Sequence, residues 1–179
     1  MFTNIAEAIQ KNLGYTPLKK VDPNTQEIKE VREMTPGEKL SQAGIPAVLA
    51  AMIKYSDGKE GINLLAVKKN KNWLSTIYYG KEKDAIKKVA DYAGVAAEEA
   101  ERHMENISDE AVRIVNDTLK TPDAEKLRSF MNSQRHSILS HLPAAMKMGD
   151  ILNEETFDDR TNKMEGPVSS FLHKIEDIL

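Results

Sequence analysis

Apolar residues return every three or four positions along most of this chain, which is the spacing of an amphipathic α-helix. In the first stretch Phe2, Ile5, Ile9 and Leu13 share one face, and Gly14 suits the left-handed position after a helix end. Strand-like alternation of apolar and polar residues is scarce. The pattern therefore predicts an all-α fold, a compact multi-helical domain of short helices.

Prolines and capping residues predict where helices begin and break. Thr35, Pro36 and Glu38 have the spacing of a capping box with proline in the first turn, so a helix should begin at about residue 36. Before it, residues 15–34 are polar and rich in turn formers, which predicts an irregular arm. Pro46 disfavours helix in the turn before it, which predicts a break or kink at residues 44–46.

Similar signals recur in the second half of the chain. Gly94 is predicted to end one helix before a second begins in VAAEEAERHMENI, and Ser108 is predicted to cap a third. Thr121 and Pro122 repeat the cap-and-proline start, and they predict a long helix that Pro143 bends or stops.

These boundaries divide the chain into three parts. Residues 1–35 hold a helix and the polar arm, residues 36–149 form the helical domain, and residues 150–179 form an acidic connector and a C-terminal amphipathic helix. An apolar face on that last helix needs a partner, which is either the core or another chain. The candidate interaction surface consists of Val168, Phe171, Leu172, Ile175 and Leu179.

Composition narrows the class of protein further. Hydrophobic residues make up 40% and charged residues 30% of the 179 positions, which is ordinary for a globular domain. There is no cysteine, which excludes disulfides, thiolate nucleophiles and cysteine-ligated clusters. The sequence has neither a secretory leader pattern nor a run of about eighteen apolar residues. We therefore expect a cytoplasmic protein without a membrane span.

Three stretches follow one another as an alanine-rich helix with a central proline, a helix pair ending in glycine, and a late serine- and proline-bearing helix. They read LSQAGIPAVLAAMIKYSDGKEGINLL, IYYGKEKDAIKKVADYAG and FMNSQRHSILSHLPAAM. This succession, over roughly residues 36–148, resembles a bacterial family of unknown function that includes YidB. The resemblance implies a multi-helical bacterial domain. That family has no agreed activity or cofactor, so the resemblance implies no catalytic residue.

A metal-dependent enzyme is the sharpest alternative, because His103, His136 and His141 accompany many carboxylates and such ligands suit zinc or iron. His136 and His141 would lie about 140° apart on a helix, which is unlike the HExxH arrangement. The paired carboxylates between residues 154 and 159 fall in the connector, where solvent would keep their pKa values together. We therefore assign no catalytic, metal-binding or cofactor-binding residue, and we expect no cofactor.

Lysines interleaved with aromatic residues suggest a second alternative, which is nucleic-acid binding through phosphate contacts and base stacking. The aromatic residues Trp73, Tyr78 and Tyr79 have near-helical spacing, which a core would use, and the net charge of −3 gives no general attraction to nucleic acid. The candidate basic patch consists of Lys68, Lys69, Lys71, Lys81, Lys83, Lys87 and Lys88.

Non-covalent association is the function that these patterns favour over catalysis. We expect an interaction or assembly module with a protein partner, and a second copy of the chain is one candidate. The metal-dependent enzyme and the nucleic-acid-binding protein remain the two alternatives.

Overall fold

The computed structural model describes residues 4–22, 25, 27–28, 33–65 and 72–158. Its regular elements are helical, and one isolated antiparallel bridge joins Val21 to Ile28. The prediction of an all-α fold is confirmed for the described part of the chain. The α-helices are α1 (Ile5–Leu13), α2 (Pro36–Asp57), α3 (Trp73–Ile77), α4 (Glu82–Ala93), α5 (Ala97–Leu119), α6 (Ala124–Leu139) and α7 (Met148–Leu152). The 3-10 helices are η1 (Gly61–Leu65), η2 (Ala144–Met146) and η3 (Glu155–Phe157).

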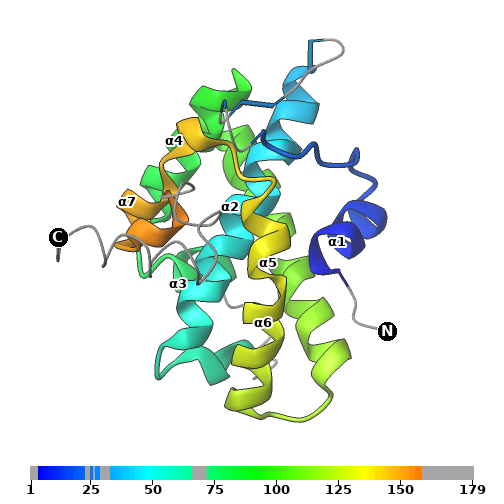
Figure 1. Cartoon of the computed structure of the whole chain (residues 1–179), viewed down its shortest axis with the longest axis vertical. Coiled ribbons are helices and arrows are strands. Elements are labelled where there is room, and N and C mark those ends of the chain that lie inside the picture. The colour runs from blue at the N-terminus through cyan, green and yellow to red at the C-terminus, as the bar shows by residue number, and fades with distance from the viewer. Residues whose placement is uncertain (1–3, 23–24, 26, 29–32, 66–71, 159–179) are drawn as a thin grey trace, which may run out of the picture.

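Helix α2 runs through the middle of the molecule, and α4, α5 and α6 all pack on it (Figure 1). Every residue from 40 to 53 is buried, as expected for a helix that is apolar all round. Of the predicted break or kink at residues 44–46, the break is wrong, because α2 continues through Pro46. A mid-helix proline costs about 3 kcal/mol. Burial of a large aliphatic side chain contributes about 1.5–3 kcal/mol, and α2 buries several around this point.

Helix α5 crosses α2 closely at Gly44. A Cβ atom added to Gly44 would lie 3.2 Å from Cδ1 of Ile107 and 3.3 Å from Cδ2 of His103. The missing side chain therefore lets the two longest helices approach each other.

Helix α5 is one helix of 23 residues where the sequence pattern predicted two. Ser108, the predicted cap, lies buried inside it and donates a hydrogen bond from its hydroxyl to the carbonyl of Glu105 at 2.9 Å. That bond satisfies a serine within a helix. The apolar face continues on both sides of it through Met104, Ile107 and Ala111, so burial on α2 outweighs the capping signal. Helices α2 and α5 are thus longer than the predicted short helices.

The signals that act within one turn were more informative. Thr35 and Glu38 form the predicted capping box, with the Thr35 hydroxyl accepting from the Glu38 N–H at 3.3 Å and the Glu38 carboxylate accepting from the Thr35 N–H at 2.8 Å. Gly14 and Gly94 end their helices in the left-handed conformation, with φ of 71° and 70°. All three predictions are confirmed.

The predicted start of α6 is wrong by two residues. Asp123 caps this helix, because its carboxylate accepts from the N–H groups of Glu125 and Lys126, each at 3.0 Å. The Thr121 hydroxyl instead donates to the carbonyl of Leu119 at 3.3 Å. An aspartate at the N-cap also interacts favourably with the helix dipole, so Asp123 is the stronger cap here.

The N-terminal arm is irregular in its described residues, as predicted, and buried Gln42 holds it in place. The side-chain carbonyl of Gln42 accepts from the N–H of Lys19 at 2.8 Å. Its amide group donates to the carbonyls of Lys19 at 3.0 Å and His141 at 2.7 Å. One polar side chain on α2 thereby joins the arm to the segment that follows α6.

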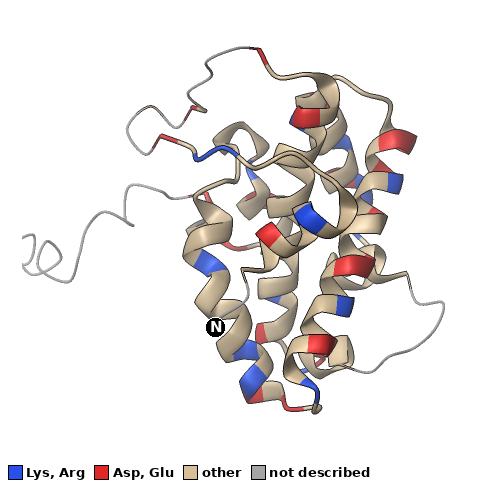
Figure 2. Cartoon of the chain, turned by 90° about the vertical axis from the view of Figure 1, so that its right-hand side faces the viewer, with Lys and Arg blue, Asp and Glu red and all other residues tan. Residues whose placement is uncertain are grey.

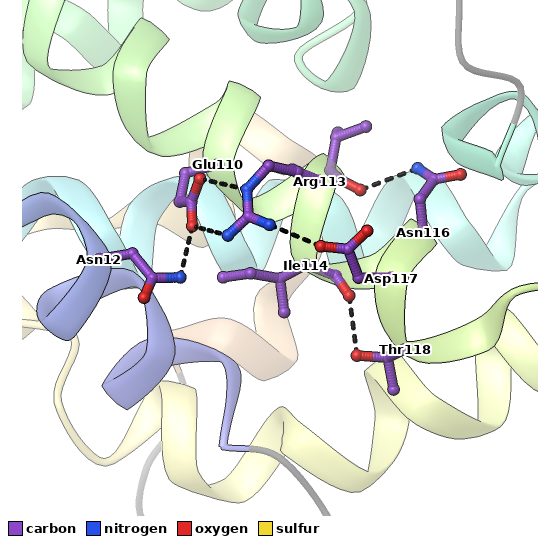
Figure 3. A network of polar contacts seen from close by, with 8 residues as sticks. Asn12, Glu110, Arg113, Ile114, Asn116, Asp117 and Thr118 are labelled. Atoms are coloured by element: carbon purple, nitrogen blue, oxygen red, sulfur yellow. Dashed lines mark hydrogen bonds and ion pairs between the residues drawn. The ribbon is translucent and has the colours of Figure 1, made fainter.

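Helix α1 is tied to α5 by a network of polar contacts on the surface (Figure 3). Asn12 donates to the Glu110 carboxylate at 2.6 Å, and Arg113 donates to the same carboxylate at 2.6 and 2.8 Å. Arg113 also bonds to Asp117 at 2.5 Å. The hydrogen bond from Arg113 lowers the pKa of Glu110. The bond from Asn12 joins α1 to α5, and the bonds of Arg113 hold the Glu110 carboxylate that accepts it.

The described end of the chain packs on the helical body rather than leaving it. Phe157 is fully buried, and the guanidinium carbon of Arg135 lies 4.5 Å from the centroid of its ring. Glu154 pairs with Lys54 of α2 at 2.9 Å. The predicted C-terminal amphipathic helix, including Val168 and Phe171, lies outside the described residues. Among the helices of the described ranges, none combines the length and apolarity that crossing a membrane requires.

Candidate functional site

The three histidines considered as metal ligands have separate surroundings. His103 of α5 stacks on Tyr15, with ring centroids 4.4 Å apart, and burial lowers its pKa to about 4. His136 is exposed on α6, whereas Nδ1 of His141 lies 2.7 Å from the carbonyl oxygen of Ser137. Within the described ranges, no group of three His, Asp or Glu side chains is placed to hold a metal ion.

The candidate basic patch is only partly described, because Lys68, Lys69 and Lys71 lie outside the described residues. Of the others, Lys87 pairs with Asp91 at 2.6 Å, and Lys88 donates to the carbonyl of Lys147 at 2.9 Å. Acidic residues share the surface with these lysines. Asp84, Asp91 and Asp150 line a hollow of about 530 Å³ together with Lys81, Lys87 and Lys88. Figure 2 likewise shows basic and acidic residues interspersed along the helices of one face.

A serine and a lysine with the S-x-x-K spacing of some acyl-transfer enzymes occur at Ser56 and Lys59. The buried Ser56 hydroxyl donates to the carbonyl of Ile53 at 2.7 Å. It is therefore committed to the last turn of α2.

The aromatic residues near the lysines separate into core and surface. Trp73 and Tyr78 are buried, as their spacing predicted, and the Tyr78 hydroxyl donates to the carbonyl of Ala47 in α2 at 2.8 Å. Burial also raises the pKa of Tyr78. Tyr79 is 57% exposed, which makes it the exposed large hydrophobic side chain of the described residues.

Tyr79 borders an open hollow of about 600 Å³, a size within the range of small-molecule and side-chain sites. Its walls come from the end of α2, from η1, and from α3 with the turn after it. We call it the Tyr79 hollow, and it is lined by Tyr55, Glu60, Asn63, Asn72, Ser75, Thr76, Tyr79 and Gly80.

The backbone after α3 determines where Tyr79 lies. The N–H of Tyr79 donates to the carbonyl of Thr76 at 3.2 Å, and the N–H of Gly80 donates to that of Ser75 at 3.0 Å. These two bonds form a Schellman motif, in which the position of Tyr79 is usually a glycine. Tyr79 has φ of 52° and Gly80 has φ of 80°. A left-handed backbone at a bulky residue costs on the order of 1 kcal/mol, and such strain clusters at functional sites.

Packing below the ring supports Tyr79 in this position. Its ring tilts by 42° against that of Tyr55, with centroids 5.3 Å apart, and Tyr55 is buried. A Cβ atom added to Gly58 would lie 3.1 Å from the Tyr79 hydroxyl, so the glycine leaves room for that group. The ring of Tyr79 is thus in contact with a buried ring, and more than half of Tyr79 remains exposed.

Several polar groups of the hollow are uncommitted within the described part of the chain. The Glu60 carboxylate and the Ser75 hydroxyl make no hydrogen bond there, and Asn63 uses only its amide nitrogen, at 3.5 Å from the Tyr55 hydroxyl. The pKa of Tyr79 is raised, first by burial and then by Tyr55 and Glu60, while Lys54 opposes the shift. The Tyr79 hydroxyl therefore stays protonated at neutral pH.

Sequence reasoning missed this hollow because its residues come from separate segments. Asn63 and Asn72 are nine positions apart and carry no motif. The one local signal is the pair Tyr78 and Tyr79 directly before Gly80, at the end of a short helix. The left-handed turn there leaves Tyr78 buried and Tyr79 exposed.

Comparison with protein-family models, with curated proteins and with solved structures finds no match for this chain. The resemblance to the YidB family therefore stays a prediction.

Proposed function

We propose that this chain is a non-catalytic interaction module that binds a protein partner through the Tyr79 hollow. The observation that carries the proposal is Tyr79 itself. It is an exposed aromatic residue, held in a strained left-handed backbone and supported by a buried ring at the rim of a hollow.

The composition of the hollow supports protein recognition. Tyrosine, serine, asparagine and glycine supply six of its eight lining residues. The same residue types dominate antibody paratopes, where tyrosine offers a large amphipathic contact area at low entropic cost and the small polar residues adapt their hydrogen bonds. A ring that is already held against Tyr55 loses little further freedom on binding, which favours affinity.

Tyrosine is also among the residues that contribute most at interfaces, and truncating such a hot spot costs about 2 kcal/mol or more. That loss corresponds to an affinity about 30-fold weaker. Tyr79→Asn is the informative variant, because asparagine tolerates the left-handed backbone and removes the ring. Tyr79→Phe keeps the ring, and Lys83→Ala changes an exposed side chain of α4 outside the hollow.

The test is quantitative capture on the immobilised full chain and its three variants, followed by affinity measurement with each purified captured protein. We expect a partner that binds the unchanged chain, Tyr79→Phe and Lys83→Ala alike, and that binds Tyr79→Asn about 30-fold more weakly. If the partner is a second copy of the chain, the same variant abolishes a concentration-dependent rise in mass. Equal affinity of every captured protein for a folded Tyr79→Asn chain contradicts the proposal.

A further inference from the structure

We infer that the partner anchors itself in the Tyr79 hollow with a cationic side chain, and that arginine fits better than lysine. This inference rests on the proposed function and adds the chemical class of the anchor.

The charge of the hollow is the first observation. Among the described lining residues Glu60 alone is acidic and none is basic, and its carboxylate has no partner within the described part of the chain. Lys54 is the cation whose charge lowers the pKa of Tyr79. It does not line the hollow, and it pairs with Glu154 at 2.9 Å. The hollow therefore has negative charge that nothing in its described lining neutralises.

The exposed ring of Tyr79 is the second observation. It contacts the ring of Tyr55 at a tilt of 42°, while more than half of Tyr79 is exposed. A cation placed over the face of an aromatic ring is attracted by the negative potential of that face. A guanidinium group also stacks on aromatic rings through its plane, which an ammonium group cannot do.

The balance of hydrogen-bonding groups is the third observation. The uncommitted acceptors are the two oxygens of Glu60, the side-chain carbonyl of Asn63 and the hydroxyl of Ser75. The amide nitrogen of Asn72 is an uncommitted donor, because only the side-chain oxygen of Asn72 is used, in accepting from the N–H of Ser75. Guanidinium has five N–H donors and no acceptor, so it complements the acceptors, which outnumber the Asn72 donor group.

Other anchors fit less well. An acidic side chain would lie beside Glu60 with no cation in the described lining to offset the repulsion. An apolar side chain would remove water from the Glu60 carboxylate without replacing its hydrogen bonds, which is unfavourable.

The test is a titration of the full chain with small-molecule probes, and binding is measured by the shifts of the backbone amide resonances. The probes are the N-acetyl amides of arginine, lysine, norleucine and glutamate. We expect the arginine probe to shift the resonances of residues 60–63 and 75–80 most strongly, with the lysine probe second. Glu60→Gln should weaken arginine binding about threefold, and raised salt should weaken it too. Glu98→Gln removes an exposed carboxylate of α5 and should change nothing.

Equal shifts from the norleucine probe, stronger shifts from the glutamate probe, or no shifts in the hollow from any probe would overturn the inference. These failures differ from failure of the proposed function. If Tyr79→Asn loses the captured partner while the arginine probe shows no preference, the anchor is wrong and the interaction site stands. If capture ignores Tyr79→Asn, the proposed function fails whatever the probes do.

Discussion

Mild acid should destabilise this protein through His103. The ring is half-buried, stacks on Tyr15, and has Nε2 3.5 Å from the Ser41 hydroxyl. Burial disfavours the charged form, so the pKa of His103 is lowered from 6.5 to about 4. The unfolded chain therefore takes up this proton at a higher pH than the folded chain does. The neutral ring contributes to the free energy of unfolding fully above pH 6.5, and this contribution is lost as the pH falls from about 6.5 towards 4.

The size of the effect follows from the two pKa values. A lowering from 6.5 to about 4 corresponds to at most about 3 kcal/mol of unfolding free energy. Because solvent reaches part of the ring, screening reduces this to about 1–2 kcal/mol. Carboxylates titrate in the same range, so a matched variant is needed to isolate the histidine.

Urea unfolding of the unchanged chain and of His103→Gln, measured at several values of pH between 7.5 and 4, provides that comparison. Glutamine is neutral throughout, so the stability of the unchanged chain relative to the variant should fall by about 1–2 kcal/mol over this range. A difference that does not vary with pH would refute the reasoning, because it would mean that water solvates the charged ring in the folded state.

Three further predictions concern packing and are checked by the free energy of unfolding in urea. Phe157→Ala should destabilise the protein by about 3–4 kcal/mol, because the ring is fully buried, and a loss below 1 kcal/mol would contradict this. Gly61→Ala should destabilise by about 1–3 kcal/mol, since the new Cβ would lie 2.5 Å from the carbonyl oxygen of Ser56. Gly37→Ala, where nothing lies within 4 Å, is its control and should stabilise slightly. Tyr79→Asn should lose no more than about 0.5 kcal/mol, because relief of the left-handed strain offsets the lost ring contact, and a larger loss would assign Tyr79 a structural role.

The helix ends that depend on hydrogen bonds and backbone freedom within one turn are the part of the fold that could be predicted. The capping box at Thr35 and the left-handed Gly14 and Gly94 depend on hydrogen bonds and backbone freedom within one turn, and the structure confirms them. Pro46 and Ser108 gave equally clear local signals, but no helix breaks at Pro46 and no helix begins at Ser108. Each lies where α2 and α5 bury a continuous apolar surface, and that burial outweighs a local preference of a few kcal/mol.

Much less of the candidate site could be predicted. Near-helical spacing correctly assigned Trp73 and Tyr78 to the core, but it assigned Tyr79 there too. The left-handed turn at Tyr79 and Gly80 ends the helical register and exposes one ring. The remaining walls of the hollow come together only through the packing of α2, η1 and α3, which no spacing in the sequence encodes.

The central claim is that the Tyr79 hollow is the partner-binding surface, and hydrogen exchange tests it most directly. Backbone exchange of the full chain would be followed with and without the captured protein that binds most tightly. We predict slower exchange in residues 58–65 and 72–81 on binding, and no such slowing when Tyr79→Asn replaces the unchanged chain. Slower exchange confined to other helices, with these two stretches unchanged, would contradict the claim.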